Sequence, residues 1–151
     1  MQIFIDTEFT QLDWTAKLIS IALVDENEDT FYVELSDNYD LSDCSDFVVV
    51  NVLPHLIGTK SEMSYDMAAL YIGKWVESRG VPCIFATDAP HWDMRLIAPM
   101  LENFWPENLA RDTKLVSIPY NKEQALFLKY GFIPHFALHD AIVNKRGTVG
   151  E

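Results

Sequence analysis

The sequence has few cysteines and no long apolar segment. Its 151 residues include only Cys44 and Cys83, too few for a disulfide framework, so we expect a reducing compartment, the cytoplasm. No apolar run approaches the roughly 18 residues that a transmembrane helix needs, and the longest, around Val48 to Leu53, is interrupted by Asn51. The opening residues, MQIFIDTEF, do not resemble a signal peptide. We therefore expect a soluble protein without membrane association.

Basic residues are also scarce. Lys and Arg number 11 against 23 Asp and Glu, which gives a formal charge of −12 and a pI near 4.6. A protein held on nucleic acid by bulk electrostatics would carry a basic stripe, and this composition argues against one. An enzyme that meets phosphate groups through bound cations is compatible with the same composition.

The chain also lacks repeats, low-complexity tracts and a Gly/Ser-rich linker, so residues 1–151 are predicted to form a single domain. A leading hairpin followed by alternating helices and strands predicts an α/β domain with a mixed sheet. Hydrophobic and turn patterns predict strands at residues 2–6, 17–24, 30–35, 82–87 and 113–118. They predict helices at 45–53, 64–79, 91–104, 121–130 and from 136 onward. Ser64 is expected to cap the helix at 64–79 and Gly80 to stop it, and Gly131 is expected to end the helix at 121–130.

Two acidic residues mark the end of the first predicted strand. Asp6 and Glu8 are two positions apart, and side chains at that spacing on a strand share a face. Both carboxylates therefore point the same way and repel each other unless a cation lies between them. Taken alone, the pair is more typical of a solvated strand end in an acidic chain than of a metal site.

Further polar residues stand near predicted helix starts. Asp93 follows the strand at 82–87, and an acid in a first helical turn also complements the helix dipole, by about 0.3–1 kcal/mol. His135 precedes the last predicted helix, and Asp140 lies in the first turns of that helix. A histidine at such a position is often a surface or capping group.

Together, these residues are compatible with one shared edge of a sheet. Clustered carboxylates raise each other's pKa unless a positive charge compensates, and Mg²⁺ or Mn²⁺, which prefer oxygen ligands, would do so. Two such ions, roughly 3.5–4 Å apart, can hold the attacking and leaving oxygens of a phosphoryl displacement. A histidine can take the proton of the attacking water. The predicted catalytic residues are Asp6, Glu8, Asp93, His135 and Asp140.

The same residues resemble the three motifs of the DEDDh 3′–5′ exonucleases, which have a ribonuclease H-like fold. The matching stretches are Asp6-Thr7-Glu8, Asp93 and His135-x-Ala137-x-x-Asp140, so the resemblance runs from residue 6 to about residue 141. The length and the early DTEF are most similar to the small bacterial 3′–5′ exoribonucleases of the mycobacterial type. The resemblance implies a mixed β-sheet with helices on both faces.

The resemblance also implies a role for each motif residue. Asp6, Glu8 and Asp140 would bind one of two divalent cations, Mg²⁺ or Mn²⁺, with Asp6 bridging to the second. Asp93 would bind directly or through water, His135 would be the general base, and His139 would be a bystander. Phe9 could stack on the terminal base, which is worth ~1–3 kcal/mol. The expected substrate contacts are Thr7, Phe9, Thr10, Asp88, Trp92 and Phe136.

Two features depart from the family pattern. The middle motif often has Asn where this chain has Asp88, which adds negative charge near the substrate path and leaves its nucleotide contact open. The chain ends about ten residues after Asp140, so basic support from the last helix is expected only from Lys145 and Arg146.

The predicted function is a metal-dependent 3′–5′ exoribonuclease that releases nucleoside 5′-monophosphates from single-stranded or short RNA. The low basic content favours short strands or 3′ ends over long nucleic acid. One alternative is a DNA exonuclease acting on single-stranded DNA, because no motif residue distinguishes ribose from deoxyribose. Another is a ribonuclease H-like binding module without catalysis. A homodimer is expected from the family resemblance alone.

Overall fold

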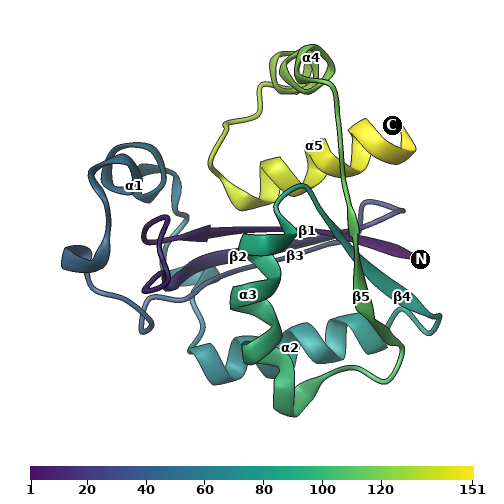
Figure 1. Cartoon of the computed structure of the whole chain (residues 1–151), viewed down its shortest axis with the longest axis horizontal. Coiled ribbons are helices and arrows are strands. Elements are labelled where there is room, and N and C mark those ends of the chain that lie inside the picture. The colour runs from purple at the N-terminus through teal and green to yellow at the C-terminus, as the bar shows by residue number, and fades with distance from the viewer.

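The computed structural model describes residues 1–151 as an α/β fold around one five-stranded mixed sheet (Figure 1). The strand order is β3-β2-β1-β4-β5, with antiparallel β1–β2 and β2–β3 pairs and parallel β1–β4 and β4–β5 pairs. The strands are β1 (Gln2–Phe9), β2 (Leu18–Asp25), β3 (Thr30–Glu34), β4 (Cys83–Thr87) and β5 (Leu109–Leu115). The predicted α/β class and mixed sheet are confirmed.

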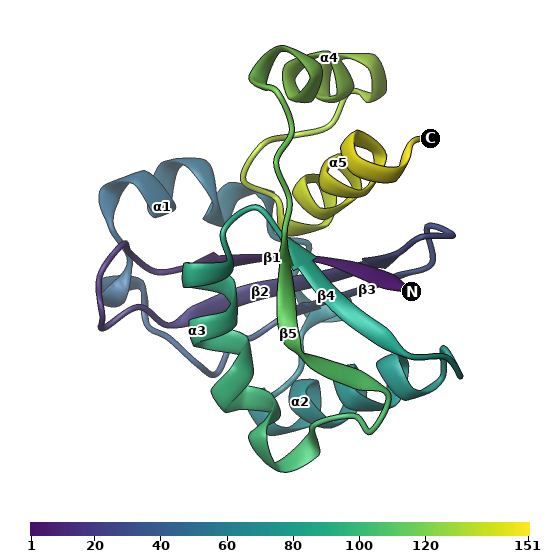
Figure 2. The ribbon, with the colours of Figure 1, turned by 45° about the vertical axis from the view of Figure 1, so that its right-hand side comes forward.

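Helices cover both faces of this sheet. Figures 1 and 2 show α5 on one side and α2 and α3 on the other. The helices are α1 (Asp46–Asn51), α2 (Tyr65–Glu77), α3 (Pro90–Leu101), α4 (Tyr120–Tyr130) and α5 (Ala137–Val149). None of them combines the length and the apolar character needed to cross a membrane.

Alternation along β1 divides the core into two layers. Ile3 and Ile5 belong to a large cluster that includes Ile72 of α2 and Ile97 of α3. Phe4 points to the opposite face and belongs to a second cluster, together with residues of β2, β4 and α5. Because successive strand residues alternate between faces, the even-numbered Asp6 and Glu8 continue the face that α5 covers.

Local signals set several helix ends as expected. The Ser64 hydroxyl caps α2 by accepting the Met67 N–H at 3.2 Å. Gly131 ends α4 with a φ of 64°, in the left-handed region that favours glycine. The predicted stop at Gly80 lies beyond the end of α2, which finishes at Glu77.

Two strands are longer than predicted. β1 continues past residue 6 to Phe9, so Asp6 and Glu8 lie within the strand and not after it. β5 begins at Leu109 and not at 113, and it ends at Leu115. Its exposed first half contains Ala110, Arg111 and Asp112, and an exposed polar edge strand gives no apolar pattern to read.

Candidate metal centre

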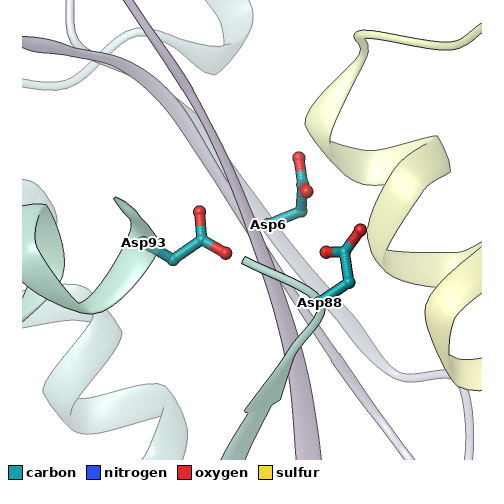
Figure 3. Close-up of side chains that lie close together, drawn as sticks. All are labelled: Asp6, Asp88 and Asp93. Carbon is teal, nitrogen blue, oxygen red and sulfur yellow. The ribbon is translucent and has the colours of Figure 1, made fainter. Parts of the chain in front are cut away.

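Carboxylates from four parts of the chain meet at the carboxyl end of β1. Oxygens of Asp6, Glu8 and Asp140 all lie within 4.8 Å of one another. Oxygens of Asp6, Asp88 and Asp93 form a second group with the same spacing, and Figure 3 shows Asp6 between the other two. We call these groups the α5 trio and the α3 trio. Asp6 belongs to both.

The sheet and its helices explain this meeting. β1 and β4 are parallel neighbours, with Phe4 opposite Ala86, so their carboxyl ends lie at the same edge of the sheet. Asp88 follows β4 directly, and Asp93 lies in the first turn of α3. The small, fully buried Ala137 and Ala141 belong to the cluster between α5 and the sheet and let α5 approach closely, which brings Asp140 beside β1.

The α5 trio has no positive partner. Burial, followed by repulsion from Asp140 and Asp93, raises the pKa of Glu8 to about 8. Burial is also the largest cause that raises the pKa of Asp140 to about 7 and the pKa of Asp6 well above its ordinary value. The uncharged forms are favoured because nothing in the chain neutralises these acids.

Asp93 has a different environment. Its carboxylate is 1% exposed and accepts the hydroxyls of Thr7, at 2.6 Å, and of Thr87. The two hydroxyls favour the charged form, but burial outweighs them and raises the pKa of Asp93 to about 6. Thr7, expected among the substrate contacts, orients Asp93 from the face of β1 opposite Asp6 and also contributes to the lining of the cavity at the trios.

A cavity of about 650 Å³ is lined by all three acids of the α5 trio and by Asp6 and Asp88 of the α3 trio, whereas the buried Asp93 lies behind its wall. Its volume lies within the range of small-molecule sites, about 300–1,000 Å³. Glu123 and Gln124 of α4 and Asn144 of α5 add polar groups to its lining, whereas no Lys or Arg lines it. The apolar part of the lining consists of Phe9, Leu12, Phe47, Val48, Val52, Phe127, Pro134 and Val143.

His135 lies at this cavity but in neither trio. The residue is exposed, and its ring makes an edge contact with Phe47 at a centroid distance of 5.0 Å. Its φ of 63° is unusual for a residue other than glycine. His139, in contrast, accepts the backbone N–H of Ile133 through Nδ1 at 2.9 Å, which gives it a structural contact outside the cavity.

The other predicted substrate residues differ in position. Phe9 lines the cavity and stacks on Trp92, with centroids 5.3 Å apart and planes 17° apart. Thr10 is fully buried, and its hydroxyl accepts the Lys17 N–H at 3.0 Å. Phe136 is 9% exposed and packs edge-on against Tyr32. Neither Thr10 nor Phe136 lines the cavity, because both side chains pack into the protein.

The basic residues of the last helix also lie elsewhere. Lys145 and Arg146 both bind Glu28, at 3.2 and 2.7 Å, at the turn between β2 and β3. They are therefore engaged at the end of α5 remote from Asp140.

Sequence reasoning gave Asp88 a different role and missed several other residues that line the cavity. Asp88 was expected to contact the nucleotide and not to join a carboxylate trio; it also accepts Asn144 Nδ2 at 3.0 Å. Glu123 and Phe47 line the cavity from α4 and α1, without any motif to mark them. Comparison with protein-family models and with curated proteins gives no match for this chain.

Proposed function

We propose that the protein is a metal-dependent 3′–5′ exonuclease of the DEDDh type, with a ribonuclease H-like fold, and that its substrate is single-stranded or short RNA. The observation that carries this proposal is the pair of carboxylate trios that share Asp6 beside one cavity. The mixed sheet with helices on both faces is consistent with the fold. The proposed reaction releases nucleoside 5′-monophosphates.

The donor set fits two Mg²⁺ or Mn²⁺ ions. Every ligand is a carboxylate oxygen, the kind of donor that these ions prefer, and no basic side chain occupies the cavity. The α5 trio would hold one ion and the α3 trio the other. When bound, the ions would polarise the scissile phosphate and offset the charge that develops on its oxygens.

The remaining chemistry belongs to residues of the chain. His135 lies at the cavity outside both trios, so its imidazole is available to take the proton of the attacking water. Thr7 and Thr87 hold Asp93 in one orientation. The apolar lining, including Phe9 and Phe127, gives the terminal base and sugar a surface to pack against.

The decisive test is a gel assay with 5′-labelled single-stranded RNA and with DNA of the same sequence, each in Mn²⁺, in Mg²⁺ and in EDTA. We expect a ladder that shortens from the 3′ end only when a divalent ion is present, with RNA shortened faster than DNA. His135→Ala should slow the shortening about 10²–10⁴-fold, the usual contribution of a general base. Calorimetry should show that this variant still binds Mn²⁺.

Each contrary result has its own meaning. Faster cleavage of DNA would make the protein a DNA exonuclease. No cleavage of either strand, with Mn²⁺ binding intact, would replace the enzyme by a binding module of the same fold. A homodimer stays a prediction, which sedimentation of the same sample would test.

A further inference from the structure

Most basic side chains of this acidic chain are already engaged. Lys17, Arg79, Arg111, Lys129, Lys145 and Arg146 form ion pairs. Lys122 donates to the Gly147 carbonyl at 2.6 Å. The cavity itself has several acids and no Lys or Arg, so it offers phosphate groups no positive side chain. A nucleic-acid strand with its 3′ end in the cavity can therefore contact a Lys or Arg side chain only outside the cavity.

Arg95 is a cation without an ion pair, and two aromatic side chains, Phe9 and Trp92, lie between it and the cavity. We call these two side chains and Arg95 the Arg95 path. Phe9 lines the cavity and stacks on Trp92 at 5.3 Å. The Arg95 guanidinium lies 5.5 Å from the Trp92 ring centroid, one turn further along α3. Arg95 has no carboxylate within ion-pair distance, so its charge is free for a ligand.

A shallow hollow lies at the end of this path. It has a volume of about 240 Å³, and its lining includes Arg95 and Lys17 together with the polar side chains of Asn38 and Tyr65. Lys17 also pairs with Asp43 at 2.9 Å, and its side chain is 45% exposed. No acid lines this hollow, in contrast to the cavity over the trios.

We propose that the single strand upstream of the bound 3′ end crosses the Phe9–Trp92 pair and that Arg95 holds one of its backbone phosphates. This inference rests on the proposed function, because it takes the cavity as the place of the 3′ nucleotide. Stacked aromatic side chains accept any base, and a guanidinium binds phosphate through two parallel hydrogen bonds. Arg95 is then a specificity-determining residue that favours substrates longer than a dinucleotide.

The test compares wild type with Arg95→Ala and with the matched control Lys74→Ala. Lys74 is an exposed, unpaired cation on α2, away from the cavity and the hollow. KM and kcat are measured in Mn²⁺ for an RNA dinucleotide and an RNA hexanucleotide. In parallel, fluorescence anisotropy gives the Kd of a labelled hexanucleotide, with Ca²⁺ as the probe cation.

For Arg95→Ala we expect KM and Kd of the hexanucleotide to rise about three- to tenfold, the loss of one charge-assisted contact. The slope of log Kd against log salt should fall by about 0.7, as for one phosphate contact to a single strand. The dinucleotide KM and the hexanucleotide kcat should not change. Lys74→Ala should match wild type in every measurement.

The outcomes separate this inference from the proposed function. Cleavage by wild type, with equal hexanucleotide Kd and salt slope for wild type and Arg95→Ala, overturns the Arg95 path alone. If wild type binds the hexanucleotide through Arg95 but does not cleave it, the proposed exonuclease function is overturned and the Arg95 contact is supported. Absence of both binding and cleavage overturns the two together. If Arg95→Ala raises the KM of the dinucleotide as much as that of the hexanucleotide, Arg95 contacts the 3′ nucleotide itself, which also contradicts the proposed upstream contact.

Discussion

Acidic side chains are paired with basic ones at one end of the sheet and lack basic partners at the other. At the turn between β2 and β3, Arg79 binds Asp25 at 2.8 Å and Asp29 at 2.5 Å. Glu28, at the same turn, holds Arg146 at 2.7 Å. Each acid named at this end has a basic partner from an element that packs nearby.

At the carboxyl end of β1, two trios of acids have no such partner. The contrast is clearest between two glutamates. The hydrogen bond from Arg146 is the largest influence on Glu28 and lowers its pKa to about 2. Burial and neighbouring carboxylates raise the pKa of Glu8 to about 8. The acids at the first end are neutralised within the chain, whereas the unmatched acids at the second end either keep their protons or take a counter-charge from solution.

The largest expected effect is on turnover. Asp6→Ala or Asp140→Ala removes a proposed metal ligand and should abolish hydrolysis, since several kcal/mol of charge stabilisation correspond to about a thousandfold or more in rate. Glu28→Gln removes an acid from the other end of the sheet and should retain turnover. Initial rates on the same RNA in Mn²⁺ make the comparison. Near-normal activity of either Asp variant would contradict the site.

The second effect is on stability, with opposite signs at the two ends. Glu28→Gln leaves Lys145 and Arg146 without their acid and should lower the free energy of unfolding by about 1–2 kcal/mol. Asp140→Asn relieves repulsion among buried acids and should raise it by about 1–2 kcal/mol in EDTA at pH 8. Urea denaturation measures both values. If both variants lost a similar free energy of unfolding, the acids at the two ends would stabilise the fold equally, which would contradict the comparison.

The third effect is a pH dependence of the metal-free protein. Folded Glu8 and Asp140 keep their protons up to about pH 8 and 7, above the pH at which the unfolded chain releases them. The folded state thus binds more protons, and stability should fall as pH rises from 5 to 8. Glu28 does not interfere, because its lowered pKa of about 2 makes its contribution disappear only below about pH 4.5.

Thermal unfolding in EDTA and in Mn²⁺ would measure this dependence. Mn²⁺ supplies the missing charge, so the ion should raise the melting temperature more at pH 8 than at pH 5. A melting temperature in EDTA that rises over this range would show that the acids are compensated by something within the chain.

Much of this architecture could be predicted because it follows from local patterns. The alternation of β1 predicted that Asp6 and Glu8 share a face, and the structure places both in the α5 trio. Ser64 and Gly131 marked helix ends through their own backbone and side-chain chemistry. These features depend on residues close together in the sequence.

The failures concern contacts between distant residues. The hydrogen bond from Thr7 to Asp93 joins residues 86 positions apart, so nothing near Thr7 indicated it. Phe136 was expected to contact the substrate, but its ring packs against Tyr32 of β3 and is buried there. Lys145 and Arg146 looked available for phosphate because Glu28, their partner, lies far away in the sequence.

The α5 trio joins the first strand to the last helix, and this has a kinetic consequence. Contacts between distant segments carry a large loop-closure cost and tend to form late in folding. In a partly folded chain that has the β1–β2–β3 hairpins but an undocked α5, Asp140 is not beside Asp6 and Glu8, so the α5 trio is incomplete. Ions that bind only the docked state should slow unfolding and leave the folding rate nearly unchanged.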